Sequence, residues 1–166
     1  MAVRNRTSIE YFRNFIFGVE DSLVSTVGLL SGVAVAGSPR DVIFITGTIL
    51  ILVEAFSMAA GSLLSGYSAE SYETKDEHIT KTDIMSSVVM FVSYAISGLI
   101  PLLPYLFLSI GNAVTVSIIL SVVSLFVLGL IGAKIAKIHL LRNAIRMAIV
   151  GGIAIMVGVL TGMIMK

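Results

Sequence analysis

Residues 42–65 of the chain read VIFITGTILILVEAFSMAAGSLLS, and Glu54 is the only charged side chain among them. A helix crosses the roughly 30 Å hydrocarbon core of a bilayer with about 20 consecutive, mostly apolar residues. This stretch meets that requirement, so it predicts a transmembrane helix with one carboxylate inside it.

Four further stretches have the same character, at residues 12–36, 84–108, 112–133 and 144–165. Of the 166 residues, 57% are hydrophobic and only 13% are charged, and the mean hydropathy is +1.02. Soluble domains carry about 25% charged residues. The sequence therefore predicts an all-α polytopic membrane protein with five transmembrane helices, which form a single membrane domain over residues 1–166 with a short acidic loop at 66–83.

Basic residues predict the orientation of these helices. Nine of the eleven Lys and Arg residues fall on one side of the predicted membrane, and only Arg40 and Lys166 fall on the other. The nine are Arg4, Arg6, Arg13, Lys75, Lys81, Lys134, Lys137, Arg142 and Arg146. Cytoplasmic loops carry the excess of Lys and Arg. We therefore expect a cytoplasmic N-terminus and a C-terminus on the outer side.

Composition also argues against several functions. The net charge is only +1, which gives no basic field for nucleic acid, and the chain has no cysteine. No nucleophile and base arrangement, phosphate loop or cofactor motif is recognisable. We therefore expect neither an enzyme nor a bound cofactor. Without a recognisable organelle-targeting signal, the plasma membrane is the first expectation, with a vacuolar or other internal membrane as the alternative.

The functional signal is the presence of acids inside the predicted spans. Glu20 and Asp21 interrupt the first span and Glu54 the second, where Met58 follows one turn later. Intramembrane acids mark ion or proton pathways by default. At 1.5 Å per residue, Asp21 lies roughly 12 Å beyond Arg13, while Met58 and Glu54 lie roughly 10 and 16 Å from Ser65. The acids of both spans are thus expected at similar depth.

The residue types indicate which ligand these positions suit. Carboxylates bind hard and borderline cations, and the thioether of Met58 adds preference for transition metals. Such a site, without Cys or His, favours an exchangeable ion such as Fe²⁺ or Mn²⁺. A carboxylate can exchange a metal for a proton. The alternatives are that Met58 only fills the core and that the acids only form structural pairs. Glu20 and Asp21 point about 100° apart, so at most one is expected to face the site.

Two further patterns have a functional and a structural interpretation. Glu70, Glu73 and Glu77 share one helical face directly beyond the second span. They either gather cations at the entrance or form a solvated face of a helix that continues into the cytoplasm. The motifs Gly28–Gly32 and Gly158–Gly162 are both GxxxG, which permits a close helix contact or a dimer seam.

Several stretches resemble the signatures of the vacuolar iron transporter family. Residues 21–29 (DSLVSTVGL) resemble its first-helix signature and residues 57–61 (SMAAG) its second. Residues 98–105 (GLIPLLPY) resemble its third, and residues 129–151 look like its fourth and fifth. The resemblance implies five-helix homodimers that exchange Fe²⁺, and often Mn²⁺, for protons and move metal out of the cytoplasm. It also implies that Asp21 and Met58 are ligands near the dimer axis, and that Glu70 and Glu73 begin a cytoplasmic metal-binding region.

The chain departs from the family pattern in two places. The family often has an acid two turns before the methionine, where this chain has Leu50, and Glu54 or Glu20 is the candidate replacement. Well-known members also insert a three-helix acidic domain where this chain has only residues 66–83. The expected function is metal export in exchange for protons. The alternatives are a passive cation channel, a carrier of another solute and a structural membrane protein.

Overall fold

A computed structural model describes residues 2–75 and 78–165, and the elements in this part of the chain are helices. They are α1 (Ala2–Val35), α2 (Arg40–Thr74), α3 (Lys81–Leu102), the short α4 (Pro104–Phe107), α5 (Ile110–Ala136) and α6 (Leu140–Ile164). Five of them are long and apolar enough to cross a membrane. The predicted fold class, an all-α multi-pass membrane protein with five spanning helices, is confirmed.

The helices extend beyond the apolar stretches that predicted them. α1 begins at Ala2 rather than near Phe12, and α2 continues past Ser65 to Thr74. With 35 residues, α2 is about 52 Å long at 1.5 Å per residue, which exceeds a hydrocarbon core of about 30 Å. The second predicted span therefore does continue as a helix into the acidic segment, as far as the structure describes it.

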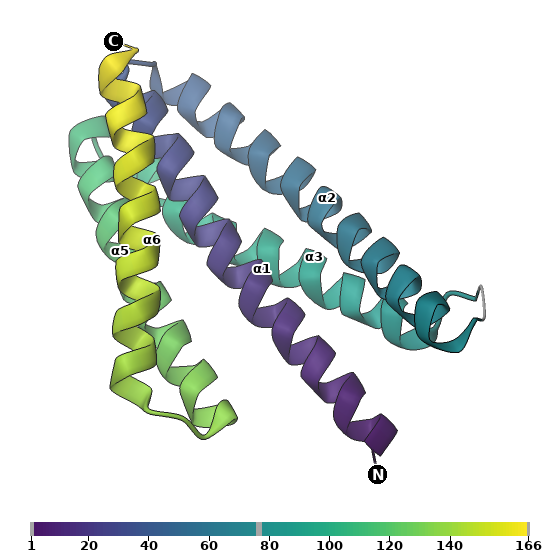
Figure 1. Cartoon of the computed structure of the whole chain (residues 1–166). Helices are drawn as coiled ribbons and strands as arrows, with labels where there is room; N and C mark the ends of the chain where they lie inside the picture. The colour runs from purple at the N-terminus through teal and green to yellow at the C-terminus, as the bar shows by residue number, and fades with distance from the viewer. Residues whose placement is uncertain (1, 76–77, 166) are drawn as a thin grey trace.

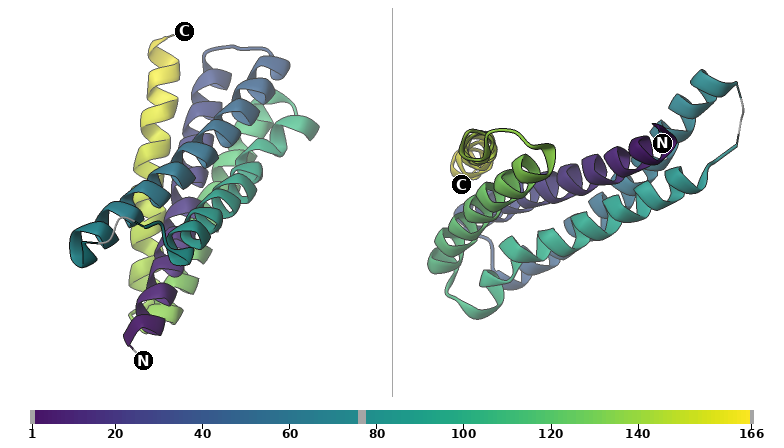
Figure 2. Two further views of the ribbon diagram at one scale, coloured as in Figure 1. Left: turned by 90° about the vertical axis from the view of Figure 1, so that its right-hand side faces the viewer. Right: turned by 90° about the horizontal axis from the view of Figure 1, so that it is seen from below.

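The two chain ends lie at opposite ends of the helix bundle (Figure 1). The end of α2, the start of α3 and the turn between α5 and α6 lie in the half of the molecule that holds the N-terminus, whereas the turn between α1 and α2 lies at the C-terminal end. The left view of Figure 2 shows the same separation of the termini. The predicted basic side of the membrane thus corresponds to one physical end of the molecule.

The hydrophobic core lies toward the C-terminal end of the bundle. Leu30 of α1, Ile43 and Ile51 of α2, and Leu102 and Tyr105 around the end of α3 belong to one buried cluster. Both α1 and α2 pack more extensively on α3 than on each other. Figure 1 shows α1 and α2 joined by a short turn at this end and spread apart toward the other.

The two GxxxG motifs meet each other inside the chain. A Cβ atom placed on Gly32 would lie 2.7 Å from the carbonyl oxygen of Gly158, and one on Gly162 would collide with the backbone of Gly32. Only glycine allows two backbones to approach this closely. Of the two interpretations of these motifs, the structure shows the close helix contact, between α1 and α6.

Side-chain hydrogen bonds satisfy backbone groups at both ends of α3. Thr80 and Asp83 form a capping box, in which the Asp83 carboxylate accepts from the Thr80 amide at 2.9 Å. At the other end, Ser117 of α5 donates to the carbonyl of Pro101 at 2.8 Å. The proline break in the third span is therefore satisfied by a neighbouring helix. Asp83 is an acid with a local structural partner.

Candidate metal-binding site

The predicted intramembrane acids lie near one another on α1 and α2. The side chains of Glu20, Asp21 and Glu54 are all half-buried. Glu20 and Asp21 are close enough for their charges to interact, and the same holds for Asp21 and Glu54. The equal depth expected from the sequence thus corresponds to a group of neighbouring carboxylates that spans two helices.

A cavity of about 1000 Å³ opens beside this group, toward the N-terminal end. Glu20 and Met58 both line it, with Arg13 of α1 and Ser57, Gly61, Ser62 and Ser65 of α2 also on its wall. Asp21 and Glu54 are not among the lining residues. Of the adjacent pair on α1, it is therefore Glu20 that faces the open cavity together with the thioether.

In sequence, Asp21 falls between the α1 residues that line two cavities. The first cavity is lined by α1 residues up to Glu20, and a second one of about 460 Å³ is lined by α1 residues from Val24 to Val33. The second cavity lies against α6, next to the contact of the two GxxxG motifs. Asp21 itself lines neither cavity, so it falls between them only by its position along the helix.

Hydrogen bonds to α3 fix the part of α1 that carries Asp21. Ser22 donates to the backbone carbonyl of Tyr94 at 2.7 Å, and the hydroxyls of Ser25 and Tyr94 are also 2.7 Å apart. Tyr94 is fully buried, and its hydroxyl is near enough to Asp21 and Glu54 to interact with their charges. These contacts fix α1 against α3 on the C-terminal side of Asp21.

The acidic stripe beyond the second span, Glu70, Glu73 and Glu77, is only partly available to bind a cation. Glu73 forms a two-oxygen ion pair with Arg6 of α1, at 2.9 and 3.0 Å. Glu70 is exposed, and its charge also acts on Arg6. Glu77 lies outside the described residues. The stripe is thus tied to the start of α1 by a solvent-exposed contact, a kind that contributes little to stability.

Sequence reasoning missed two lining residues of the first cavity. Met90 of α3 places a second thioether on its wall, and Arg13 places a cation there. A lone methionine in an apolar span has no distinguishing pattern, so no sequence signal could have found Met90. In the sequence, Arg13 serves as a marker of orientation and as a reference for depth, and its place two turns before Glu20 is the signal that could have located it on this wall.

One described chain does not complete a conventional ligand set. Within residues 2–75 and 78–165, no three or more Asp, Glu or His side chains gather closely enough to hold one metal ion. The arrangement instead offers neighbouring carboxylates and a nearby thioether in a partly open setting. This suits weak, exchangeable binding better than a structural metal site.

Comparison with known proteins gives a consistent result. A family model described as the VIT family matches residues 12–85 and 72–163. The chain is 25% identical over 158 residues to "Vacuolar iron transporter homolog 4" of Arabidopsis thaliana, which covers 87% of this chain and 79% of that protein. It is 25% identical over 159 residues to "Vacuolar iron transporter homolog 2" of the same plant, with 89% and 81% covered. It is also 36% identical over 75 residues to "Vacuolar iron transporter 1" of Oryza sativa subsp. japonica, with 45% and 30% covered. Because the family model spans nearly the whole chain, the protein belongs to the VIT family.

Proposed function

We propose that this protein transports divalent transition metal, with Fe²⁺ as the main substrate and Mn²⁺ as a second one, out of the cytoplasm in exchange for protons. The observation that carries the proposal is the group of Glu20, Asp21 and Glu54 inside the membrane, beside a cavity shared by Glu20 and Met58. The relatives named as vacuolar iron transporters support metal as the transported substrate.

The two cavities suggest an order of events for the metal. The ion enters the larger cavity from the N-terminal end and meets Glu20 and Met58, which line it. It then passes to Asp21, supported by Glu54. Release follows toward the second cavity, which begins one turn further along α1. Asp21 is the principal carboxylate in this scheme because it falls on α1 between Glu20, which lines the first cavity, and Val24, which lines the second.

Proton exchange follows from the chemistry of the same carboxylates. Burial favours the protonated form of an acid, whereas a bound cation favours the ionised form. A carboxylate that alternates between a metal and a proton couples the two fluxes in opposite directions. Met58 carries no proton, so in this scheme it contributes to the choice of metal rather than to the coupling.

A second copy of the chain would complete the site. Within its described residues, one chain nowhere gathers three or more His, Cys, Asp or Glu side chains that could hold a metal ion. A two-fold homodimer presents each ligand twice, so two Asp21 and two Met58 side chains can converge on one ion near the axis. The half-open cavity between α1 and α2 is where such a partner would fit.

The acidic stripe is the proposed entrance. Glu70, Glu73 and Glu77 would raise the local cation concentration at the N-terminal end, and an arriving metal would compete with Arg6 for Glu73. Because only residues 66–83 stand where well-known members carry a larger acidic domain, we expect weaker metal capture than in those members. The names of the relatives refer to the vacuole and lend no support to the plasma membrane, so we place the protein in an internal membrane.

Metal flux into proteoliposomes under an imposed pH gradient tests the proposal. The key variant is Asp21→Asn, and Asp41→Asn is its matched control, because Asp41 is an exposed acid in the first turn of α2. We expect uphill Fe²⁺ movement in the wild type and in the control, and none in Asp21→Asn. Flux that ignores the gradient would indicate a passive channel. An equal loss of Fe²⁺ flux in both variants would contradict a specific role for Asp21 in the site.

A further inference from the structure

The turn between α5 and α6 carries a dense group of basic residues. Lys134 and Lys137 end α5, and Arg142 and Arg146 lie in the first turns of α6. All four side chains are exposed. We call these four residues the basic corner. It lies at the same end of the molecule as the N-terminus (Figure 1).

The basic corner has no acidic counterpart. After Asp83 the sequence contains no Asp or Glu at all. Within the described part of the chain, none of the four cations forms an ion pair with a carboxylate. The acids at the same end are instead found near α1 and α2, where Arg6 binds Glu73. The corner therefore presents an unneutralised positive charge.

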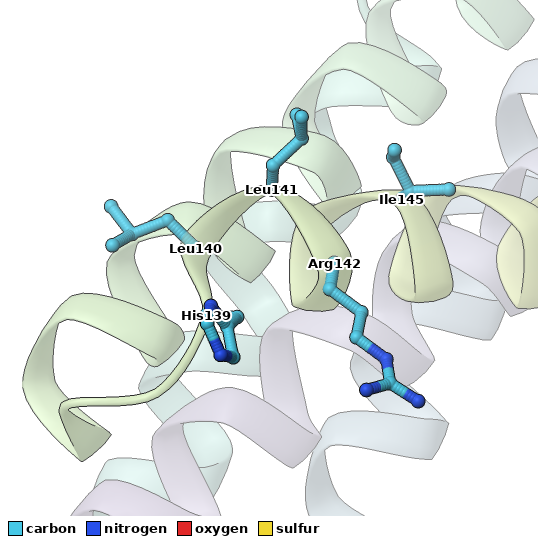
Figure 3. Close-up of a pocket in the computed structure, with 5 residues that line it drawn as sticks. All are labelled: His139, Leu140, Leu141, Arg142 and Ile145. Carbon is cyan, nitrogen blue, oxygen red and sulfur yellow. The ribbon is translucent and has the colours of Figure 1, made fainter.

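A cavity of about 600 Å³ opens at this corner, lined by His139, Leu140, Leu141, Arg142 and Ile145. Figure 3 shows Leu141 and Ile145 on one side of the first turns of α6, and His139 and Arg142 on the opposite side. Arg146 follows Arg142 by four residues and so extends the basic side by one turn. The start of α6 thus has an apolar side and a basic side, and residues from both sides line the open cavity.

The backbone holds this arrangement in place. Lys137 adopts a left-handed conformation with φ of 55°, and the amide of Ile138 donates to the carbonyl of Ala133 at 3.0 Å. This is a typical helix stop, and α6 begins three residues later at Leu140. The basic residues of both helices are therefore presented together by one short, hydrogen-bonded turn.

The surrounding surface indicates where the ligand comes from. Leu141 is 62% exposed and Ile138 is 53% exposed, beside Leu140 and Ile145, which are exposed as well. A soluble anion makes no favourable contact with these apolar side chains, whereas a lipid carries both a charged headgroup and acyl chains. Basic pockets beside transmembrane helices are suited to anionic lipid headgroups.

We propose that the basic corner is a binding site for the phosphate headgroup of an anionic membrane lipid, in the leaflet at the N-terminal end of the molecule. Arg142 and Arg146 bind the phosphate, Lys134 and Lys137 add positive charge, and Leu141 with Ile145 contacts the acyl chains. Scattered surface cations attract an anionic leaflet in general, whereas here Arg142, Leu141 and Ile145 line one open hollow, so a headgroup and its acyl chains can be bound together.

Lipid retention by the purified protein tests this site without any transport assay. The probes are phosphatidylglycerol and phosphatidylcholine, offered together in detergent micelles and counted by native mass spectrometry. The test variant is Arg142→Gln with Arg146→Gln. The control is Lys75→Gln with Lys81→Gln, which removes the same charge at the same end from exposed positions on the other side of the bundle.

We expect the wild type and the control to retain phosphatidylglycerol about tenfold over phosphatidylcholine, a preference in the range expected from two surface cations. The double arginine variant loses this preference, and Arg142→Lys with Arg146→Lys keeps most of it, which excludes misfolding as the cause. Equal losses in the two Gln pairs would overturn the proposal in favour of general attraction. Full displacement of the lipid by millimolar glycerol phosphate would overturn the lipid assignment in favour of a free phosphate.

Discussion

At the scale of single residues, the chemistry depends on where each polar group points. Glu20 and Asp21 are neighbours in sequence, yet only Glu20 lines the larger cavity, whereas Asp21 is near enough to Glu54 for their charges to interact. Adjacent helical residues differ by about 100° in direction, so the two acids cannot share one task. In the proposed transport path, Glu20 receives the ion from the cavity and Asp21 passes it on.

Met58→Leu tests whether the thioether selects the metal. Leucine keeps the volume and apolar character of the side chain, so the cost in stability should stay below about 1.5 kcal/mol. We expect Fe²⁺ flux to continue but to become more sensitive to competition by Mg²⁺ or Ca²⁺, which avoid sulfur ligands. Met156→Leu is the control, since that exposed residue of α6 lies on a different cavity. Unchanged competition in Met58→Leu would identify Met58 as a wall residue only.

Arg6→Gln tests whether Arg6 competes with metal at the entrance. Arg6 and Glu73 are both largely exposed, so their contact is screened by salt and adds little to stability. Removing the cation frees Glu73, and we expect half-maximal transport at a lower metal concentration, most clearly at low ionic strength. Lys75→Gln removes a nearby cation that is not ion-paired to Glu73. Similar curves for both variants would mean that overall charge, not the ion pair, governs capture.

At the scale of helices, the contact of α1 with α6 supports the segment that carries the acids. Gly158→Ala places a Cβ against the backbone of Gly28, where no flexible side chain can yield. Overpacking of this kind costs about 1–3 kcal/mol. We expect a clear fall in the thermal unfolding midpoint in detergent. Gly152→Ala, which points into open space on the same helix, should be neutral or slightly stabilising because alanine favours helix. An unchanged unfolding midpoint in Gly158→Ala would show that α1 and α6 can move apart without a loss of stability.

The sequence is sufficient to predict the helices but not how they meet. Hydropathy locates all five spans, because each must satisfy its backbone internally in lipid. It misses the extension of α2 to Thr74, since a helix outside the bilayer has no apolar signature. It also leaves open whether Gly32 and Gly158 meet within one chain or between two. Likewise, the depths of Asp21 and Glu54 follow from counting residues, whereas the place of Met90 on the cavity wall follows only from packing.

At the scale of the whole molecule, the orientation in the membrane is open to a direct test, because the chain contains no cysteine. Arg40→Cys and Lys137→Cys introduce single thiols at exposed positions near opposite ends of the bundle. We expect an impermeant maleimide to label Arg40→Cys from the outer side, or from the lumen of an internal membrane. Lys137→Cys should be labelled only from the cytoplasmic side. Labelling of both from one side would contradict the excess of basic residues as the guide to topology.

Assembly is the last feature of the proposed mechanism to test, since the described part of one chain brings together no three His, Cys, Asp or Glu side chains that could hold a metal ion. If two chains complete the site across α1 and α2, residues of α2 on the cavity wall lie near their own copies at a two-fold axis. Ser57→Cys and Gly61→Cys are both exposed on that wall, and disulfides form only when two Cα atoms come within about 7 Å. We expect mild oxidation to give a cross-linked dimer from at least one of them, and none from the exposed Val150→Cys on α6. A dimer cross-linked only through Val150→Cys would place the partner against α6 instead of α1 and α2. The acids of each chain would then have to bind metal without ligands from the partner.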